Sequence, residues 1–105
     1  MKEFNVGMLD VAPSNFFNGT ELFDVDRSKN VIDACELFDV SILGMEGFRI
    51  SGGNRIPDMD CIVDFSPLLN KFGSNFPDFS RKSAREFIES ICDNEILIEF
   101  VLVKV

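Results

Sequence analysis

The stretch that decides the fold lies near the end of the chain, where residues 95–103 read Glu-Ile-Leu-Ile-Glu-Phe-Val-Leu-Val. Almost every position is apolar and several are β-branched, which favours an extended strand. A strand that is apolar on both faces lies inside a sheet that other elements cover on at least one side. We therefore expect residues 96–103 to form a strand within such a sheet.

Two helices are expected before this strand. In the nearer one, Ser83-Ala84-Arg85-Glu86 has the Ser-x-x-Glu form of a capping box, with Ser83 as the N-cap. The other is expected over about residues 28–38, with Asp26 or Ser28 as its N-cap. In both, the apolar residues recur on one helical face: Ala84, Phe87, Ile88, Ile91 and Cys92 in the first, and Val31, Ile32, Cys35 and Phe38 in the second.

The rest of the chain predicts shorter strands and loops. Residues 4–11 and 40–43 are candidate strands, and residues 48–51 and 60–65 are expected to pair as an antiparallel hairpin across a long loop that contains a turn at Gly52-Gly53-Asn54. Residues 67–79 predict one helical turn at 68–72, followed by a loop. The predicted fold class is α+β: a single domain over residues 1–105, with a mostly antiparallel sheet and two main helices packed on it.

The charge balance favours a protein partner. Eighteen acidic residues face ten basic ones, the net charge is −8, and histidine is absent, although 46% of the chain is hydrophobic. A negative field of this size attracts basic partners and repels nucleic acid and anionic membranes, so neither of these is expected as a partner. The alternative is that the acidity serves solubility alone.

Several features of the sequence indicate a cytoplasmic protein. The first ten residues lack the apolar core of a signal peptide, and no apolar run is long enough for a membrane span. Cys35, Cys61 and Cys92 are odd in number and widely spaced, and each lies in an apolar run. They are expected to be reduced, buried thiols.

The sequence offers little for catalysis. Two Asp-x-Asp pairs, at 24/26 and 58/60, are the only carboxylate pairs of note, and the first begins like an EF-hand loop. That loop would need glycine and glutamate where Lys29 and Cys35 stand, so we expect no metal there. No nucleophile, phosphate-binding or dinucleotide motif is present. We therefore expect no enzyme and no cofactor, with a carboxylate-only hydrolase or a metal-dependent enzyme as a minor alternative.

The run of residues 40–49, Val-Ser-Ile-Leu-Gly-Met-Glu-Gly-Phe-Arg, resembles the ILGGDVY segment of the immunity protein 40 family, small bacterial proteins of polymorphic-toxin systems. A helix with a central alanine precedes that segment in the family, and residues 31–38, with Ala34, are similar to it. The family's Ser-x-x-x-Ala-x-x-aromatic-Ile helix and apolar final strand resemble residues 80–88 and 96–103. The chain departs from the family at Met45, Glu46, Gly47 and Phe48 and lacks its tryptophan.

This resemblance implies a cytoplasmic antitoxin of a contact-dependent growth-inhibition system, which binds a cognate toxin domain and blocks it. Acidic charge would complement a basic toxin, for example a nuclease. The alternative is an acidic accessory or regulatory subunit of a larger assembly that buries its Phe-rich loops. The oligomeric state stays open. The expected partner-binding residues are acids in loops, with two phenylalanines as apolar anchors: Asp24, Asp26, Glu46, Asp58, Asp60, Phe76 and Phe79.

Overall fold

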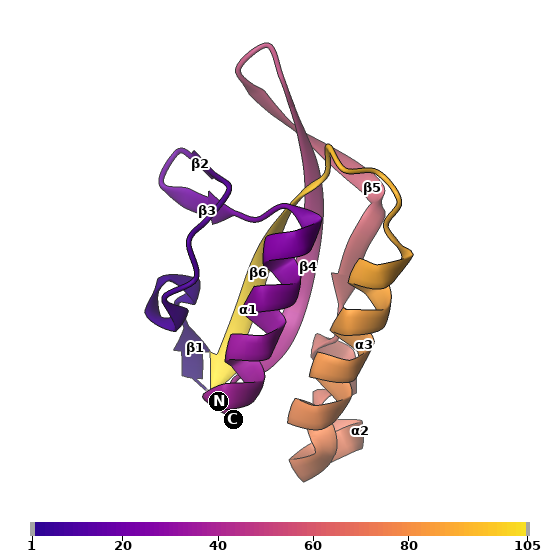
Figure 1. Ribbon diagram of the computed structural model, residues 1–105. Coiled ribbons are helices and arrows are strands. Elements are labelled where there is room, and N and C mark those ends of the chain that lie inside the picture. Colours follow the sequence, from indigo (N-terminus) through magenta and orange to yellow (C-terminus); the bar gives the residue numbers. More distant parts are fainter. Residues whose placement is uncertain (1, 105) are drawn as a thin grey trace.

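Four strands form one antiparallel sheet in the computed structural model, which describes residues 2–104 (Figure 1). The strands lie in the order β1-β6-β4-β5. Two helices, α1 and α3, lie side by side over one face of this sheet, and no helix of the described residues covers the other face (Figure 1). The predicted α+β fold, with a mostly antiparallel sheet and two main helices, is confirmed. The strands of the sheet are β1 (Lys2–Phe4), β4 (Ser41–Ser51), β5 (Asn54–Asp64) and β6 (Leu97–Lys104).

Shorter elements connect and flank the sheet. A small hairpin projects beside the sheet, and its last strand leads into Phe23, which forms an isolated bridge with Ile98 of β6. The expected strand over residues 4–11 is wrong beyond Phe4, because a 3-10 helix follows it. The remaining elements are the 3-10 helix Val6–Leu9, β2 (Asn15–Phe17), β3 (Thr20–Leu22), α1 (Val25–Leu37), α2 (Leu69–Phe72) between two 3-10 turns (Ser66–Leu68 and Gly73–Asn75), and α3 (Phe76–Ser90).

Helix α1 begins earlier than its predicted start at Ser28. Asp24 is the N-cap, and its side chain accepts a hydrogen bond from the Arg27 backbone N–H at 2.7 Å. Ser28 is instead buried, and its hydroxyl donates to the Phe23 carbonyl at 3.4 Å. The competing carboxylate at residue 24 therefore sets the start of the helix, and the predicted caps at Asp26 and Ser28 are wrong.

Helix α3 also begins earlier than predicted, at Phe76 rather than after Ser83. Pro77 lies in the first turn of the helix. Proline has no backbone N–H, but N–H groups in the first turn have no acceptor within the helix, and the fixed φ of proline is close to the helical value. Ser83 therefore lies inside the helix, and the predicted capping box is wrong, as is the loop expected up to residue 79. The helix ends at Ser90, which leaves Cys92 outside it and exposed, so the prediction of a buried thiol is wrong there.

Strands β4 and β5 form a hairpin with a two-residue turn rather than the long loop expected. Gly52 and Gly53 have φ angles of 58° and 78°, the positive values that such a turn requires. The turn itself was predicted correctly. The two strands stay paired on both sides of a bulge in β5. Glu46 pairs with Ile62, but the next residue, Gly47, pairs with Asp58, so residues 59–61 of β5 form the bulge.

The core lies between the sheet and the two helices. Phe23 and Phe100 meet edge to face there, with ring centroids 5.9 Å apart. Cys35 is fully buried, as predicted, and burial raises the pKa of its thiol to about 12. The fully buried members of the core are Phe23, Val31, Ile32, Cys35, Val40, Ile42, Ala84, Ile88 and Ile98.

Candidate protein-binding site

Four of the five acids expected to bind a partner gather at one end of the molecule. They surround the loop between α3 and β6, in the upper part of Figure 1. Two cavities of about 270 and 320 Å³ meet at this loop, because Ile91, Cys92 and Asp93 line both of them. We name this surface the acidic end and define it by Asp24, Asp26, Asp58, Asp60 and Asp93.

The start of α1 supplies two of these acids. Asp24 is held by the Arg27 backbone N–H, and Asp26 lies exposed in the first helical turn. Carboxylates are favourable at this position because the free N–H groups of a helix start carry partial positive charge. Both side chains line the smaller cavity, opposite the loop after α3.

The bulge of β5 supplies Asp58 and Asp60. Asp58 Oδ1 accepts a hydrogen bond from the Asp60 backbone N–H at 3.0 Å, which fixes the bent backbone. Gly47 makes room for this bend, since a Cβ at residue 47 would lie 2.5 Å from the Cβ of Cys61. Met59, between the two acids, is 77% exposed. The bulge thus places two carboxylates at the larger cavity, while Met59 between them is exposed and does not line it.

One arginine partly neutralises the acidic end. Arg49 Nη1 lies 2.5 Å from Asp93 Oδ2, and its Nη2 lies 3.4 Å from Asp58 Oδ2. The pKa of Asp93 is lowered, first by a hydrogen bond from the Glu95 backbone N–H and then by Arg49. Among residues 2–104, no ion pair is seen for Asp24, Asp26 or Asp60. The acidic end therefore keeps a negative excess.

The larger cavity has an apolar floor beneath its acidic rim. The floor consists of the side chains of Phe87, Ile91 and Ile96. Phe87 lies in α3, Ile91 directly follows this helix, and Ile96 directly precedes β6. An apolar floor with a charged rim is the usual anatomy of a protein-binding surface. In the part of the chain that the structure describes, no three His, Cys, Asp or Glu side chains are grouped so that they could hold a metal ion.

The other expected site residues lie elsewhere. Glu46 is exposed on the helix-free face of the sheet, directly opposite Glu99 of β6. Phe76 is fully buried, so the prediction of a surface anchor is wrong there: as the first residue of α3 it faces the interior. Phe79 is half-buried and stacks on Phe72, with ring centroids 3.9 Å apart.

Asp93, Arg49 and the apolar floor were not predicted from the sequence. Asp93 follows the last residue of the predicted apolar helix face, and Arg49 lies in a predicted strand, so neither position indicates a site. No local pattern joins them, because their contact depends on how the β4–β5 hairpin lies against the loop after α3. The signal that the sequence does carry is the apolar face of the last helix, which includes Phe87 and Ile91 of the floor.

Comparisons with known proteins leave the family open. No protein-family model matches the chain, and no curated protein or solved structure matches it. Within residues 2–104, no helix combines the length and the apolar character needed to cross a membrane.

Proposed function

We propose that this chain is an immunity protein that binds a cognate bacterial toxin domain at the acidic end and blocks it. The observation that carries the proposal is the gathering of Asp24, Asp26, Asp58 and Asp60 around a loop with an apolar cavity beneath it. The resemblance of residues 28–105 to the immunity protein 40 family supports the same reading. Such an inhibitor acts inside the producing cell, so we place it in the cytoplasm.

The inhibition would be occlusion without chemistry. Lysine or arginine side chains of a basic toxin, such as a nuclease, would meet the carboxylates that have no internal partner, and an apolar side chain would enter the larger cavity. Matching of opposite charge mainly raises the association rate and excludes wrong partners, while the desolvated apolar contact supplies affinity. Arg49 keeps Asp58 and Asp93 paired, so the partner's cations would meet Asp26 and Asp60 instead.

A second function, a permanent subunit of a larger assembly, is favoured by the β4–β5 hairpin. This hairpin projects beyond the rest of the sheet (Figure 1), and it carries exposed apolar side chains, with Ile56 at 46% and Met59 at 77% exposure. A subunit of that kind is expected to self-associate or aggregate when it is expressed alone. A free immunity protein is expected to elute as a folded monomer in size-exclusion chromatography.

The deciding experiment is co-expression with the toxic C-terminal domain encoded by the adjacent upstream reading frame. We expect growth to be rescued and the two proteins to co-purify in a one-to-one complex. The test variant is the double substitution Asp26→Lys and Asp60→Lys, which reverses two exposed acids that hold no ion pair in the described chain. The matched control, Glu86→Lys with Glu89→Lys, makes the same charge change on exposed residues of α3 that line neither cavity.

The association rate separates the outcomes. We expect the Asp26/Asp60 variant to associate about tenfold more slowly than the Glu86/Glu89 control at low salt, because it changes the local field rather than the net charge alone. Equal rates for the two variants would remove the acidic end as the binding surface. A lack of both rescue and complex formation with the parent chain would reject the immunity function for that pair and favour the subunit.

A further inference from the structure

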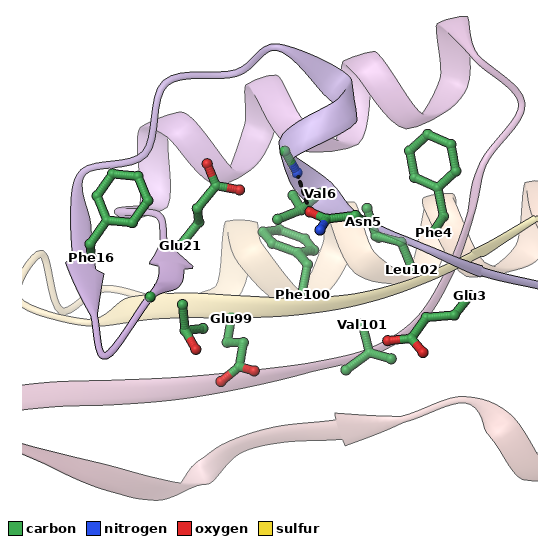
Figure 2. Close-up of a pocket in the computed structure, with 13 residues that line it drawn as sticks. Glu3, Phe4, Asn5, Val6, Phe16, Glu21, Glu99, Phe100, Val101 and Leu102 are labelled. Carbon is green, nitrogen blue, oxygen red and sulfur yellow. Dashed lines mark hydrogen bonds between the residues drawn. The ribbon is translucent and has the colours of Figure 1, made fainter.

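A second surface of the molecule is a groove at the edge of β6, away from the acidic end. Its volume is about 740 Å³, within the range of ligand-binding clefts. Figure 2 shows Phe16 and Glu21 on the side of the β2–β3 hairpin, and Phe4 and Asn5 on the side of β1. β6 runs between these two walls, with Phe100 toward the helices. We call this cavity the edge groove.

The edge groove lies where the sheet edge is interrupted. Strand β1 pairs with β6 only as far as Phe4 opposite Leu102, and the next pairing on this edge is the bridge of Phe23 with Ile98. Backbone groups alternate sides along a strand, and those of Ile98 point toward this edge, where they exchange two hydrogen bonds with Phe23. The backbone N–H and C=O of Phe100 therefore point into the gap.

Phe100 has no backbone partner in this gap among residues 2–104. The residue as a whole is only 7% exposed, but its backbone N–H and C=O face the edge groove, where a strand partner would replace water. The gap between the two pairings runs from Ile98 to Leu102, which is four residue-to-residue steps or about 13 Å, because a strand rises about 3.3 Å per residue. An extended segment of one or two residues fits there and can complete the ladder.

The charges around the edge groove have one sign. Three glutamates line it, Glu3, Glu21 and Glu99, and none of its lining residues is basic. Arg55 approaches Glu99 from the helix-free face, with Nη1 2.8 Å from Oε1. Glu3 and Glu21 have no ion pair within the described part of the chain. The groove thus offers carboxylates on both sides of an unpaired backbone position.

We propose that the edge groove binds an extended, basic segment of a protein partner. One residue of the segment pairs with the Phe100 backbone, and a lysine or arginine beside it reaches Glu3 or Glu21. Exposed Phe16, at 61% exposure, and Val101, at 42%, cover the apolar part of the segment. A second copy of this chain is disfavoured as the occupant, because two molecules of net charge −8 repel each other. The proposal is independent of the function proposed for the acidic end.

The test is a titration of the isotopically labelled full chain with a short peptide, followed by amide NMR spectra. The probe is acetyl-Gly-Val-Arg-Val-Lys-Gly-amide, and its matched control has glutamine in place of arginine and lysine. We expect the basic peptide to shift the amide signals of Phe4, Thr20 and Phe100 and to slow hydrogen exchange at the Phe100 amide. The glutamine peptide should bind about tenfold more weakly, the loss expected for about 1.4 kcal/mol of charge interaction.

Variants locate the binding. Glu3→Lys with Glu21→Lys should reduce binding of the basic peptide about tenfold, whereas Glu86→Lys with Glu89→Lys should change it less than twofold. Asp26→Lys with Asp60→Lys, which tests the acidic end, should also leave peptide binding unchanged. The proposal is overturned if the peptide does not bind, if the shifts map to the loop after α3, or if the Glu3/Glu21 variant binds as the control does. Concentration-dependent shifts of the same amides without peptide would identify a second copy as the occupant instead.

Discussion

Replacing Gly47 by alanine tests how the acidic end is built. Gly47 lies on β4 opposite the bulge of β5, and it faces the side of the sheet that the helices cover. A Cβ at this residue would lie 2.5 Å from the Cβ of Cys61 and 3.2 Å from Cγ2 of Ile96. Carbon atoms pack best at about 3.5–4.0 Å, so the bulge has to move by about 1 Å.

The magnitude follows from two opposed effects. Alanine in a strand is favoured over glycine by about 0.5–1 kcal/mol, because glycine loses more backbone entropy on folding. Overpacking a closely packed site costs about 1–3 kcal/mol, and here the obstructing atom is a Cβ, which cannot rotate away. We expect a net destabilisation of about 1–2 kcal/mol, or roughly 4–16 °C in Tm for a domain of this size.

The assay is a double-mutant cycle by urea unfolding. Cys61→Gly removes the obstructing Cβ, so Gly47→Ala should cost at least about 1 kcal/mol less in that background than in the parent chain. Recovery should be partial, because Ile96 stays at 3.2 Å. The matched control, Gly19→Ala, places a methyl group in open space, and any cost there comes from its positive φ alone.

Two results would refute this reasoning. If Gly47→Ala is as stable as the parent chain, the bulge does not lie against β4 as described. If its cost is the same with and without Cys61→Gly, the loss arises elsewhere. In either case the positions of Asp58 and Asp60 over the larger cavity would need another explanation.

Three further predictions concern buried groups and pH. Ser80→Ala should lower the free energy of unfolding in urea by about 1–3 kcal/mol, because it removes the hydroxyl that accepts a hydrogen bond from the buried Ile42 N–H at 3.0 Å. The control Ser90→Ala, at an exposed serine, should cost much less, and equal losses would show that the Ser80–Ile42 hydrogen bond does not stabilise the fold. At mildly alkaline pH, Cys92 should react with a thiol reagent at once and Cys35 only on unfolding, because burial raises the pKa of Cys35 to about 12. Cys61 is partly buried and should react more slowly than Cys92, and rapid loss of all three thiols would contradict the packing. The pKa of Asp93 is lowered from 3.8, so the ionised side chain contributes stability above that pH, and this contribution is lost as the pH falls through the lowered pKa. Asp93→Asn should therefore reduce the loss of unfolding free energy at acid pH in a pH series. An unchanged slope would argue against the hydrogen bonds from Glu95 and Arg49.

Much of the fold could be predicted because its main signals are local. The run of apolar residues in β6 and the helical spacing of Ala84 and Ile88 depend only on near neighbours in the chain. The turn at Gly52-Gly53 could be predicted for the same reason, since positive φ angles are a property of the residue type. These three features are enough to place a sheet, a helix on it and a hairpin.

The start of α3 could not be predicted in this way. The phenylalanines before Ser83 show no regular period, because they serve two surfaces at once. Phe76 faces the interior, whereas Phe79 stacks on Phe72 at 3.9 Å and meets Phe65 at 5.8 Å. The helix therefore extends through residues whose local pattern is typical of a loop. Tertiary packing of the phenylalanines outweighs the capping-box pattern at Ser83.

The site was predicted in part, for a reason of the same kind. Acids in Asp-x-Asp pairs are visible in the sequence, and four of them do share one end of the molecule. Their common location depends on the bulge of β5 and on the loop after α3, neither of which has a local signature. Glu46 was grouped with them by charge alone, and the register of β4 places it on the opposite face of the sheet.

The role of Arg49 explains how the acidic end can exist in the free protein. Like charges that face each other across a small cavity raise the energy of the folded state. Arg49 offsets this repulsion for Asp58, on the bulge, and for Asp93, on the loop after α3. Asp26 and Asp60 are exposed, so water screens their charges. The cation thus stabilises the acids that shape the cavity and leaves unpaired those that can meet a partner. A basic partner would gain its charge contacts at the unpaired acids without first breaking the ion pairs that hold the cavity open.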